Sequence, residues 1–363
     1  IMESLLKKYF KNKTIIITGH TGFKGSWLTL WLKTLGANIV GISKDVPTKP
    51  ALFEEANLKK GIVDIRMDLR NLSKLNIIFR KYKPDFIFHL AAQSLVKESY
   101  NFPIKTFQSN TIGTLNVLEC IRNLNKKCIS ILITSDKSYK NLELNRGYKE
   151  NDILGGKDPY SASKASAELV IQSYINSFFN SASNGKLIAI ARAGNVIGGG
   201  DWSKNRLIPD CVKAWSKNKT AIIRNPKSTR PWQHVLEAIR GYLDLAIKLK
   251  KNNKLHGEAF NFGPKASQNK KVIELIKQGK KNWKKIKWRI NKTSKSKFES
   301  KLLKLNSNKA KKNLNWVPIL KFTDTVEMVI NWYKKYYYEG NKDIFVFSKK
   351  QLDSYLQKVN KSN

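Results

Sequence analysis

A short apolar run followed by a glycine-rich turn is the feature that most limits how this chain folds. Residues 14–18 read Thr-Ile-Ile-Ile-Thr, which is typical of a β-strand, and residues 26–32 have the composition of a helix. Glycine allows a tight turn and a close approach of backbone to phosphate, and the helix that follows offers free N–H groups. The pattern predicts a dinucleotide site, and a plain strand-to-helix turn is the alternative. The site residues would be Gly19, Thr21, Gly22, Phe23, Lys24 and Gly25.

Strands and helices continue to alternate along the first half of the chain. Apolar, β-rich runs predict strands at residues 38–43, 62–66, 86–90, 129–134 and 187–191, and helical periodicity covers residues 106–123 and 160–179. This alternation predicts an α/β fold with a doubly wound parallel sheet of the Rossmann type.

The second half of the chain is less regular and predicts a smaller lobe. We expect a dinucleotide-binding domain over residues 1–190, with a return segment near 230–256. A C-terminal α/β lobe for the substrate would then comprise residues 191–229 and 257–340, and no pattern assigns residues 341–363. Helices 106–123 and 160–179 are candidates for the four-helix interface of a homodimer or homotetramer.

One thirty-residue window gathers the side chains best suited to move protons. It starts at the end of a predicted strand with Ser135, Asp136 and Lys137, and it ends on a predicted helix with Tyr160 and Lys164. Ligands of doubly wound sheets bind at the carboxyl ends of the strands, so we predict a reaction centre here. A salt bridge or a surface position is the structural alternative for Lys137.

Tyr160 and Lys164 lie four residues apart, on one face of a helix. A nearby ammonium favours the phenolate, so Lys164 is expected to lower the pKa of Tyr160 from about 10 and to make it a general base. A lysine base must be neutral, so Lys137 would need a dry site. A surface pair on an amphipathic helix is the alternative for Tyr160 and Lys164.

Several residues after the predicted strands are suited to the other parts of a dinucleotide. Asp45 is placed to bind a ribose and would favour NAD, whereas Lys44 could accept a 2′-phosphate, so the sequence leaves NAD and NADP open here. Asp64 could accept a hydrogen bond from an adenine amine. The remaining candidates are Ile65, Ala91, Ala92, Gln93 and Asn110, of which the small residues would let a flat cofactor lie close to the backbone.

The net charge of +41 would ordinarily suggest a nucleic-acid partner. Only eleven of the 68 basic residues are Arg, however, and the lysines are scattered among Asn rather than gathered beside aromatic residues. We therefore expect neither a nucleic-acid nor a membrane partner. The three cysteines and four histidines lack metal-ligand spacing, which predicts reduced thiols and no structural metal. No apolar run approaches eighteen residues and no secretory signal pattern is found, so we expect a cytoplasmic protein.

Taken together, these motifs resemble the nucleotide-sugar branch of the extended short-chain dehydrogenase/reductase family. The resemblance covers residues from about 10 to about 340, and its most specific stretches are residues 18–25, Asp136-Lys137 where related dehydratases carry Asp-Glu, residues 192–202 (Arg-Ala-Gly-Asn-Val-Ile-Gly-Gly-Gly-Asp-Trp) and residues 230–235 (Arg-Pro-Trp-Gln-His-Val). It implies an NAD-dependent 4,6-dehydration of a nucleotide sugar in deoxysugar biosynthesis, with CDP-glucose as the expected substrate.

The resemblance also implies roles for individual residues. Tyr160, tuned by Lys164 and assisted by Ser135, would take the proton of the sugar C4 hydroxyl; Lys137 would act as base at C5 while Asp136 protonates the leaving C6 hydroxyl. In the second half, Asn195 and Arg206 would contact the nucleotide sugar, Arg230 its pyrophosphate, and Trp232 to His234 would close the sugar pocket. Surface cations and core packing are the alternatives for these last residues.

The segment from Asn291 to Leu305 departs from the family pattern. It retains Glu299 but has no histidine, where related chains carry a His-rich run, and this leaves recognition of the base open. A nucleotide-sugar 4-epimerase and a 4,6-dehydratase for another nucleotide sugar are the nearest alternatives. A basic nucleic-acid-binding protein on an inactive Rossmann scaffold is the alternative outside enzymes.

Overall fold

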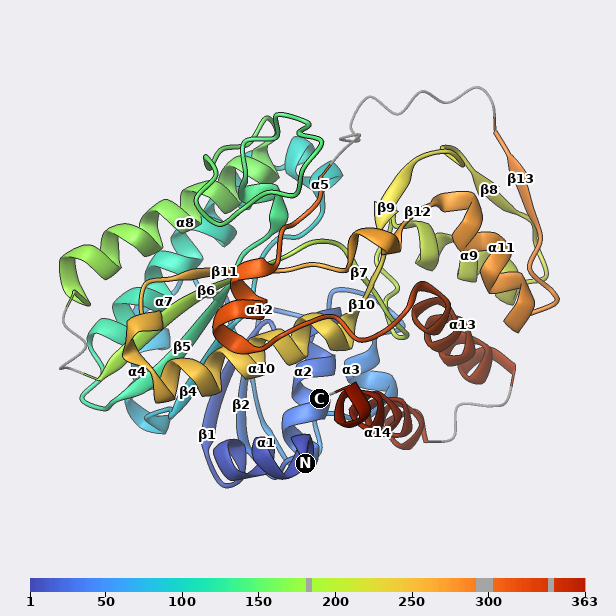
Figure 1. The fold of residues 1–363 in the computed structure, drawn as a ribbon. Coiled ribbons are helices and arrows are strands. Elements are labelled where there is room, and N and C mark those ends of the chain that lie inside the picture. The colour runs from blue at the N-terminus through green and yellow to red at the C-terminus, as the bar shows by residue number, and fades with distance from the viewer. Residues whose placement is uncertain (181–184, 292–302, 339–342, 363) are drawn as a thin grey trace.

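A seven-stranded parallel sheet forms the centre of the molecule (Figure 1). The structure is a computed structural model that describes residues 1–180, 185–291, 303–338 and 343–362. The strand order is β11-β6-β5-β4-β1-β2-β3, and β1 pairs in parallel with β2 on one side and with β4 on the other. The chain reverses its direction of travel across the sheet between β1 and β4, which is the point where such sheets bind ligands. The predicted Rossmann fold is confirmed.

Except for residues 259–262, which were not predicted as a strand, the strands fall close to their predicted places, because most of the apolar, β-branched runs are buried on both faces; residues 63–66, at one edge, are only partly buried. Seven strands form the sheet. They are β1 (Thr14–Thr18), β2 (Asn38–Ser43), β3 (Val63–Arg66), β4 (Phe86–His89), β5 (Cys128–Ile133), β6 (Lys186–Ala193) and β11 (Ala259–Phe262). The helices around them are α1 (Met2–Phe10), α2 (Phe23–Thr34), α3 (Leu52–Glu55), α4 (Leu72–Tyr82), α5 (Val96–Asn101), α6 (Pro103–Phe107), α7 (Gly113–Arg122), α8 (Pro159–Phe178), α10 (Val235–Lys251), α12 (Asn308–Leu314) and α14 (Ile344–Ser362).

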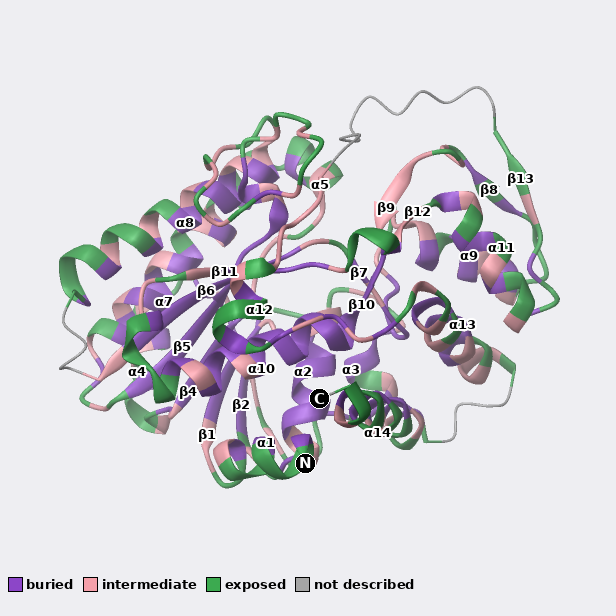
Figure 2. Ribbon diagram, viewed as in Figure 1, coloured by how far each residue is buried: buried purple, intermediate pink, exposed green. Residues whose placement is uncertain are grey.

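Alternate residues of each strand enter two separate cores. On one face, residues such as Ile16 and Leu132 pack with α4, α7 and α8. On the other face, residues such as Ile15 and Ile131 pack with α2 and α10 in a larger core that continues into the C-terminal lobe. The strands are accordingly buried, while the outer faces of α8, α12 and α14 are exposed (Figure 2). Cys120, Cys128 and Cys211 are free and buried, as predicted.

The C-terminal lobe is built from short strands and three helices. Its strands are β7 (Val196–Ile197), β8 (Ala221–Ile223), β9 (Thr229–Pro231), β10 (Gln233–His234), β12 (Asn269–Lys271) and β13 (Trp288–Ile290), which pair as β7 with β10, β8 with β13 and β9 with β12. Its helices are α9 (Leu207–Ser216), α11 (Val272–Asn282) and α13 (Phe322–Tyr338). Trp202 lies edge-on to Trp332, Tyr333 and Tyr336 of α13 and so joins the glycine-rich segment after β6 to this lobe.

Two segments differ from the expected division of the chain. The return segment does not end at residue 256, because β11 pairs with β6 as the outer strand of the sheet. The unassigned C-terminal residues form α14, whose Tyr355 packs edge-on to Trp31 of α2. Arg240 donates to the Tyr355 hydroxyl, which donates to Glu237, and all three side chains are buried. Helix α14 therefore covers the helix that follows the glycine-rich turn.

The helix predicted over residues 106–123 is not a single α-helix. Helix α6 runs into a π-helical segment, η1 (Gln108–Ile112), and α7 begins directly after it. Segments of this kind are rare and often occur at functional sites. Two short 3₁₀ turns, η4 (Asn253–Leu255) and η5 (Ala266–Gln268), connect elements elsewhere. No helix within the described ranges has the length and apolar character to cross a bilayer.

Candidate active site

The glycine-rich turn is packed so tightly that side chains would not fit. A Cβ atom on Gly25 would lie 2.0 Å from the carbonyl oxygen of Gly19, and one on Gly19 would lie 2.7 Å from the backbone nitrogen of Ala91. Gly22 is the N-cap of α2, and no side chain caps the free N–H groups of the first turn of this helix. The cradle, the uncapped helix and its place at the switch point of the sheet fit a pyrophosphate, as the sequence predicts.

Other predicted cofactor residues are already engaged within the protein. His20 Nε2 lies 2.9 Å from Asp64 Oδ1, and Arg66 donates to Asp64 Oδ2 at 3.0 Å. The Thr21 hydroxyl donates to the backbone oxygen of Asp45 at 2.6 Å. Asp64 therefore holds the turn through His20, in addition to any contact with an adenine, and Ile65 packs against the core beside it.

Asn110 links the segment after β4 to helix α8. Its side-chain oxygen accepts from the backbone N–H of Gln93 at 2.8 Å, and its nitrogen donates to Gln93 O at 3.0 Å and to Ser163 Oγ at 2.8 Å. Ser163 in turn donates to the backbone oxygen of Tyr160 at 2.7 Å. The π-helical segment η1 carries Asn110 into this position, where it bonds both Gln93 and the first turn of α8. Ala91 and Ala92 lie just before Gln93, half-buried beside the glycine-rich turn.

Ser135, Asp136 and Lys137 lie on a 3₁₀ turn, η2 (Asp136–Ser138), directly after β5. Ser135 Oγ donates to Asp136 Oδ1 at 3.0 Å and accepts from the backbone N–H of Lys137 at 3.2 Å. Burial raises the pKa of Asp136, and this outweighs the opposing effects of Lys137, Ser135 and Lys24. A raised pKa suits a proton donor. Lys137 is half-buried and not enclosed in the dry site that the sequence analysis requires.

Tyr160 is buried beside this turn and hydrogen-bonded to Ser135. Burial raises the pKa of Tyr160 to about 12, although the Ser135 hydrogen bond and Arg206 oppose the change. The predicted lowering of this pKa is therefore wrong, because desolvation of the phenolate outweighs its favourable contacts. Burial also lowers the pKa of Lys164 to about 8, with Lys24 adding to the effect and Glu168 opposing it.

Lys24 joins the same group of charges from the first turn of α2. Burial lowers its pKa to about 8; Arg206 adds to this effect and Asp136 opposes it. The structure thus brings Lys24, Asp136, Lys164 and Arg206 close enough to affect one another. Lys24 was expected at the cofactor and Arg206 at the substrate, and their spacing in the sequence does not predict that the two cations are neighbours.

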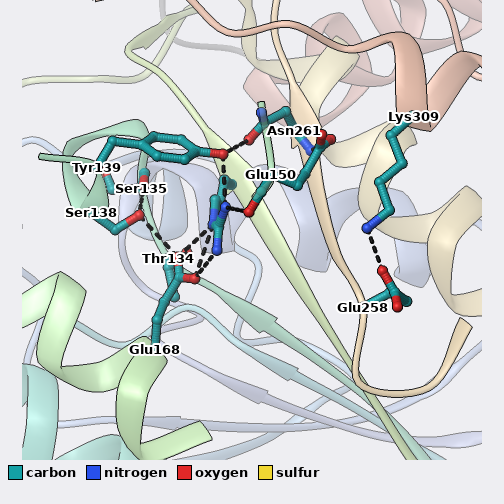
Figure 3. Close-up of polar contacts among 10 residues, drawn as sticks. Thr134, Ser135, Ser138, Tyr139, Glu150, Glu168, Glu258, Asn261 and Lys309 are labelled. Carbon is teal, nitrogen blue, oxygen red and sulfur yellow. Dashed lines mark hydrogen bonds and ion pairs between the residues drawn. The ribbon is translucent and has the colours of Figure 1, made fainter. Parts of the chain in front are cut away.

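Sequence reasoning also missed a buried ion pair beneath the turn. Arg192 of β6 donates from Nε to Oε1 and from Nη2 to Oε2 of Glu168 on α8, and both side chains are almost fully buried. Glu168 Oε1 also accepts from Thr134 Oγ1 at 2.6 Å and from Ser138 Oγ at 2.9 Å (Figure 3). The signal was present in the sequence, because Glu168 follows Tyr160 and Lys164 at intervals of four residues and so shares their helix face.

The residues of the C-terminal lobe that were predicted to bind substrate lie in different environments in the structure. Arg206 occupies the N-cap position of α9, and its side chain pairs with Asp201 at 3.0 Å. Its positive charge also opposes the rise in the pKa of Tyr160. Asn195 is exposed just after β6, and Arg230 is half-exposed on β9. Arg206 is thus placed at the reaction centre.

Trp232 and His234 are instead buried in the core. The Trp232 indole donates to Lys270 O at 2.9 Å, and the His234 ring lies edge-on to Trp27, with burial lowering the His234 pKa to about 3. This packing does not support the expectation that they close a sugar pocket, because Trp232 belongs to the apolar core and His234 is completely buried against Trp27. The departure from the family pattern at residues 291–305 lies mostly outside the described residues. No cluster of metal-ligating residues occurs in the described ranges.

A protein-family model and several known proteins match this chain. The family model described as GDP-mannose 4,6-dehydratase matches residues 16–329. The chain belongs to this family. The CDP-glucose 4,6-dehydratase of Salmonella typhimurium is 41% identical over 354 residues, which cover 96% of this chain and 98% of that protein. These findings confirm the resemblance seen in the motifs.

More distant members of the same fold include epimerases. The UDP-glucose 4-epimerase of Mycoplasma genitalium is 25% identical over 341 residues, covering 89% of this chain and 97% of that protein. Among solved structures, the dTDP-glucose 4,6-dehydratase of Streptomyces venezuelae with NAD and TYD bound superimposes with a TM-score of 0.73 at 20% identity, over 89% of this chain and 97% of that one. At this identity the family structure supports the fold alone.

Proposed function

We propose that the protein is a hydro-lyase of the cytoplasm that converts CDP-glucose to CDP-4-keto-6-deoxy-glucose, with NAD as its cofactor. The observation that carries this proposal is the 41% identity to a CDP-glucose 4,6-dehydratase over nearly the full length of both chains. The placement of Tyr160, Ser135 and Asp136 at one edge of the sheet supports it, because the reaction needs a base and an acid side by side.

The residues that would hold NAD are those of the glycine-rich turn and the segment after β4. The free N–H groups at the start of α2 would bind the pyrophosphate, and Gln93, Asn110 and Lys164 would line the nicotinamide end. Lys44 pairs with Asp68 at 3.6 Å, which favours NAD over a cofactor with a 2′-phosphate. The chemistry supplied by bound NAD is acceptance of a hydride from sugar C4 and its return to C6.

Tyr160 carries the first proton transfer. Its oxygen takes the proton of the C4 hydroxyl in the phenolate form, which is the minor form because burial raises the Tyr160 pKa to about 12. Ser135 holds both this oxygen and the neighbouring carboxyl group of Asp136 by hydrogen bonds. The O–H bond loses its proton and the C–H bond at C4 loses its hydride, which bound NAD would accept, so that C4 becomes a ketone. The ketone makes the proton at C5 acidic, which prepares the elimination.

Asp136 and Lys137 carry the elimination. The Lys137 amine, which is half-buried and which the bound sugar would have to enclose, takes the C5 proton in its neutral form. Asp136, whose pKa is raised by burial, donates a proton to the C6 hydroxyl, which leaves as water. The proton held by Lys137 then returns to C5 as C6 receives the hydride. The balance is the loss of one water molecule and no net oxidation.

The C-terminal lobe would supply recognition. Arg206 is placed to contact the sugar nucleotide beside Tyr160, Arg230 to bind the pyrophosphate, and Asn195 to reach the same ligand from the end of β6. The lobe is the part in which the family members must differ in order to choose among nucleotide sugars.

We also propose that the protein is a homodimer formed through α6, η1 and α8. These elements carry large exposed apolar side chains: Ile104, Phe107, Ile112, Leu169 and Phe178. Covering such a surface is favourable, and two helices from each of two copies would form a four-helix interface.

The proposal is tested by assaying CDP-glucose, dTDP-glucose, UDP-glucose and GDP-mannose side by side at equal salt. A site that hydrogen-bonds its base leaves buried groups unpaired with the wrong ligand, so we expect kcat/KM for CDP-glucose to exceed the others by about 100-fold or more. Equal rates would remove the CDP assignment, and a C4 epimer as product would remove the dehydratase assignment. Chromatography of the nucleotide released on denaturation should identify NAD, since the cofactor is regenerated in each cycle.

A further inference from the structure

A single buried carboxylate holds both ends of the turn that carries Ser135, Asp136 and Lys137. Glu168 Oε1 accepts from Thr134 Oγ1 at 2.6 Å, directly before the turn. It also lies 2.9 Å from Ser138 Oγ at the end of the turn, whose single proton is shared with the backbone oxygen of Ser135 at 2.7 Å. Glu168 is completely buried on α8, two helical turns beyond Tyr160. The same helix therefore presents Tyr160 to the reactants and fixes the turn that faces it.

Arg192 holds Glu168 in place and extends the contacts to the loop that follows. Its Nε donates to Glu168 Oε1 at 2.8 Å, and its Nη1 donates to Tyr139 Oη at 2.7 Å and to the backbone oxygen of Glu150 at 2.9 Å. Tyr139 Oη donates to Asn261 Oδ1 at 2.8 Å (Figure 3). The guanidinium of this β6 residue thus bonds Glu168 on α8, Tyr139 directly after the 3₁₀ turn η2, and Glu150 in the loop between Lys137 and Tyr160.

We propose that Glu168, held by Arg192, is a positioning residue that sets the distance between Tyr160 and the Ser135–Lys137 turn through the hydroxyls of Thr134 and Ser138. This inference deepens the proposed function, on which it rests. A buried ion pair alone would only stabilise the fold, and its net contribution can be small. The two hydroxyl contacts are the additional feature, since they join the carboxylate to the residues that flank the catalytic groups.

The contacts of Glu168 matter for this reaction because of the positions of the reacting groups. Proton transfer at C4 and at C5 uses groups from two elements, α8 and the turn after β5, and small displacements between reacting groups cost orders of magnitude in rate. The contacts of Thr134 and Ser138 with Glu168 are short, buried and charge-assisted, which makes them stronger than neutral hydrogen bonds. Loss of either should loosen the turn without removing a group that touches the substrate.

The test compares Thr134→Val with Thr134→Ser. Valine keeps the shape of threonine but cannot donate to Glu168, whereas serine keeps the hydroxyl. We expect Thr134→Val and Ser138→Ala each to lower kcat about 10-fold with KM within about twofold of the parent, and Thr134→Ser to stay within about threefold. Thr34→Val is the matched control, because the Thr34 hydroxyl bonds only the backbone of Trp31 at the far end of α2.

Hydrogen exchange of the peptide covering residues 134–140 gives a readout that does not depend on turnover. Exchange should rise in Thr134→Val and Ser138→Ala, remain near the parent level in Thr134→Ser, and be unchanged in all three for the peptide covering β1 and α2. Parent-like kcat and exchange in both hydroxyl-deleted variants, or equal losses for Thr134→Val and Thr134→Ser, would overturn the proposal. If the parent does not convert CDP-glucose, the proposed function fails, and the exchange data still decide whether Glu168 holds the turn.

Discussion

The edge of the central sheet and the C-terminal lobe hold their charged groups in different ways. At the sheet edge, Asp136, Lys164, Glu168 and Arg192 are buried; Glu168 pairs with Arg192, and burial raises the pKa of Asp136 and lowers that of Lys164. In the lobe, the half-exposed Arg230 remains in contact with solvent. We therefore expect catalysis to depend on the sheet edge and substrate recognition on the lobe. Variants at the sheet edge should mainly change kcat, and variants in the lobe should mainly change KM.

The largest effect should come from Tyr160→Phe at the sheet edge. Removing the phenol oxygen removes the group that takes the C4 proton, and we expect kcat to fall about 1,000-fold while the nucleotide sugar still binds. Steady-state kinetics and calorimetric titration measure the two quantities. A change confined to KM would contradict the assignment of catalysis to the sheet edge.

Lys137→Ala should separate the two chemical steps within the sheet edge. We expect turnover to fall about 100-fold, with oxidation at C4 retained, so that CDP-glucose produces the near-ultraviolet absorbance of reduced nicotinamide without product. Lys140→Ala is the control, because Lys140 is exposed in the segment after the turn. Parent-like turnover in Lys137→Ala would show that another group is the C5 base.

In the lobe, Arg230→Lys should change recognition and leave the chemistry intact. Lysine keeps the charge but cannot bind a phosphate with a two-pronged contact, so we expect KM to rise about 10-fold and kcat to stay within about threefold. Arg289→Lys, at an exposed position on β13 of the same lobe, is the matched control. A fall in kcat with unchanged KM would place Arg230 with the chemical groups.

The smallest effect concerns the pH profile. Lys164 has its pKa lowered to about 8 by burial and by Lys24, so its ammonium charge is lost as pH rises through about 8, and kcat should fall on that side. Glu168 opposes this lowering, and His89, whose pKa burial lowers to about 3, is neutral there. Lys24→Met, assayed with saturating NAD, should move this limb upward by about 0.5–1.5 pH units, since a neighbouring cation is removed.

A downward shift of the alkaline limb in Lys24→Met would contradict this account of the charges. Lys33→Met is the control, because Lys33 lies at the other end of α2 and is exposed enough to bond the backbone of Lys60. Its profile should match that of the parent.

Much of the sheet could be predicted from sequence because most of its strands are apolar runs, whereas β11 was missed because its four residues, Ala259–Phe262, are too short a run to stand out. The glycine-rich turn could also be predicted, because the requirement for glycine arises from close backbone contacts within the turn itself and with Ala91. The contacts of Arg192 were not readable, because they join β6, α8 and the loop at Glu150 through side chains far apart in the chain. The Tyr160 pKa failed for a related reason, since burial comes from the whole fold and a local spacing cannot report it.

The π-helical segment at Gln108–Ile112 has a consequence for how this chain tolerates insertions and deletions. A π turn closes its hydrogen bonds over one residue more than an α turn, so deletion of Thr111 would return the segment to regular α geometry. The shift would rotate Asn110 by about 100° about the helix axis and separate it from Gln93 and Ser163. Insertions and deletions should therefore not be tolerated between Pro103 and Arg122, whereas the exposed loops of the lobe can accommodate them.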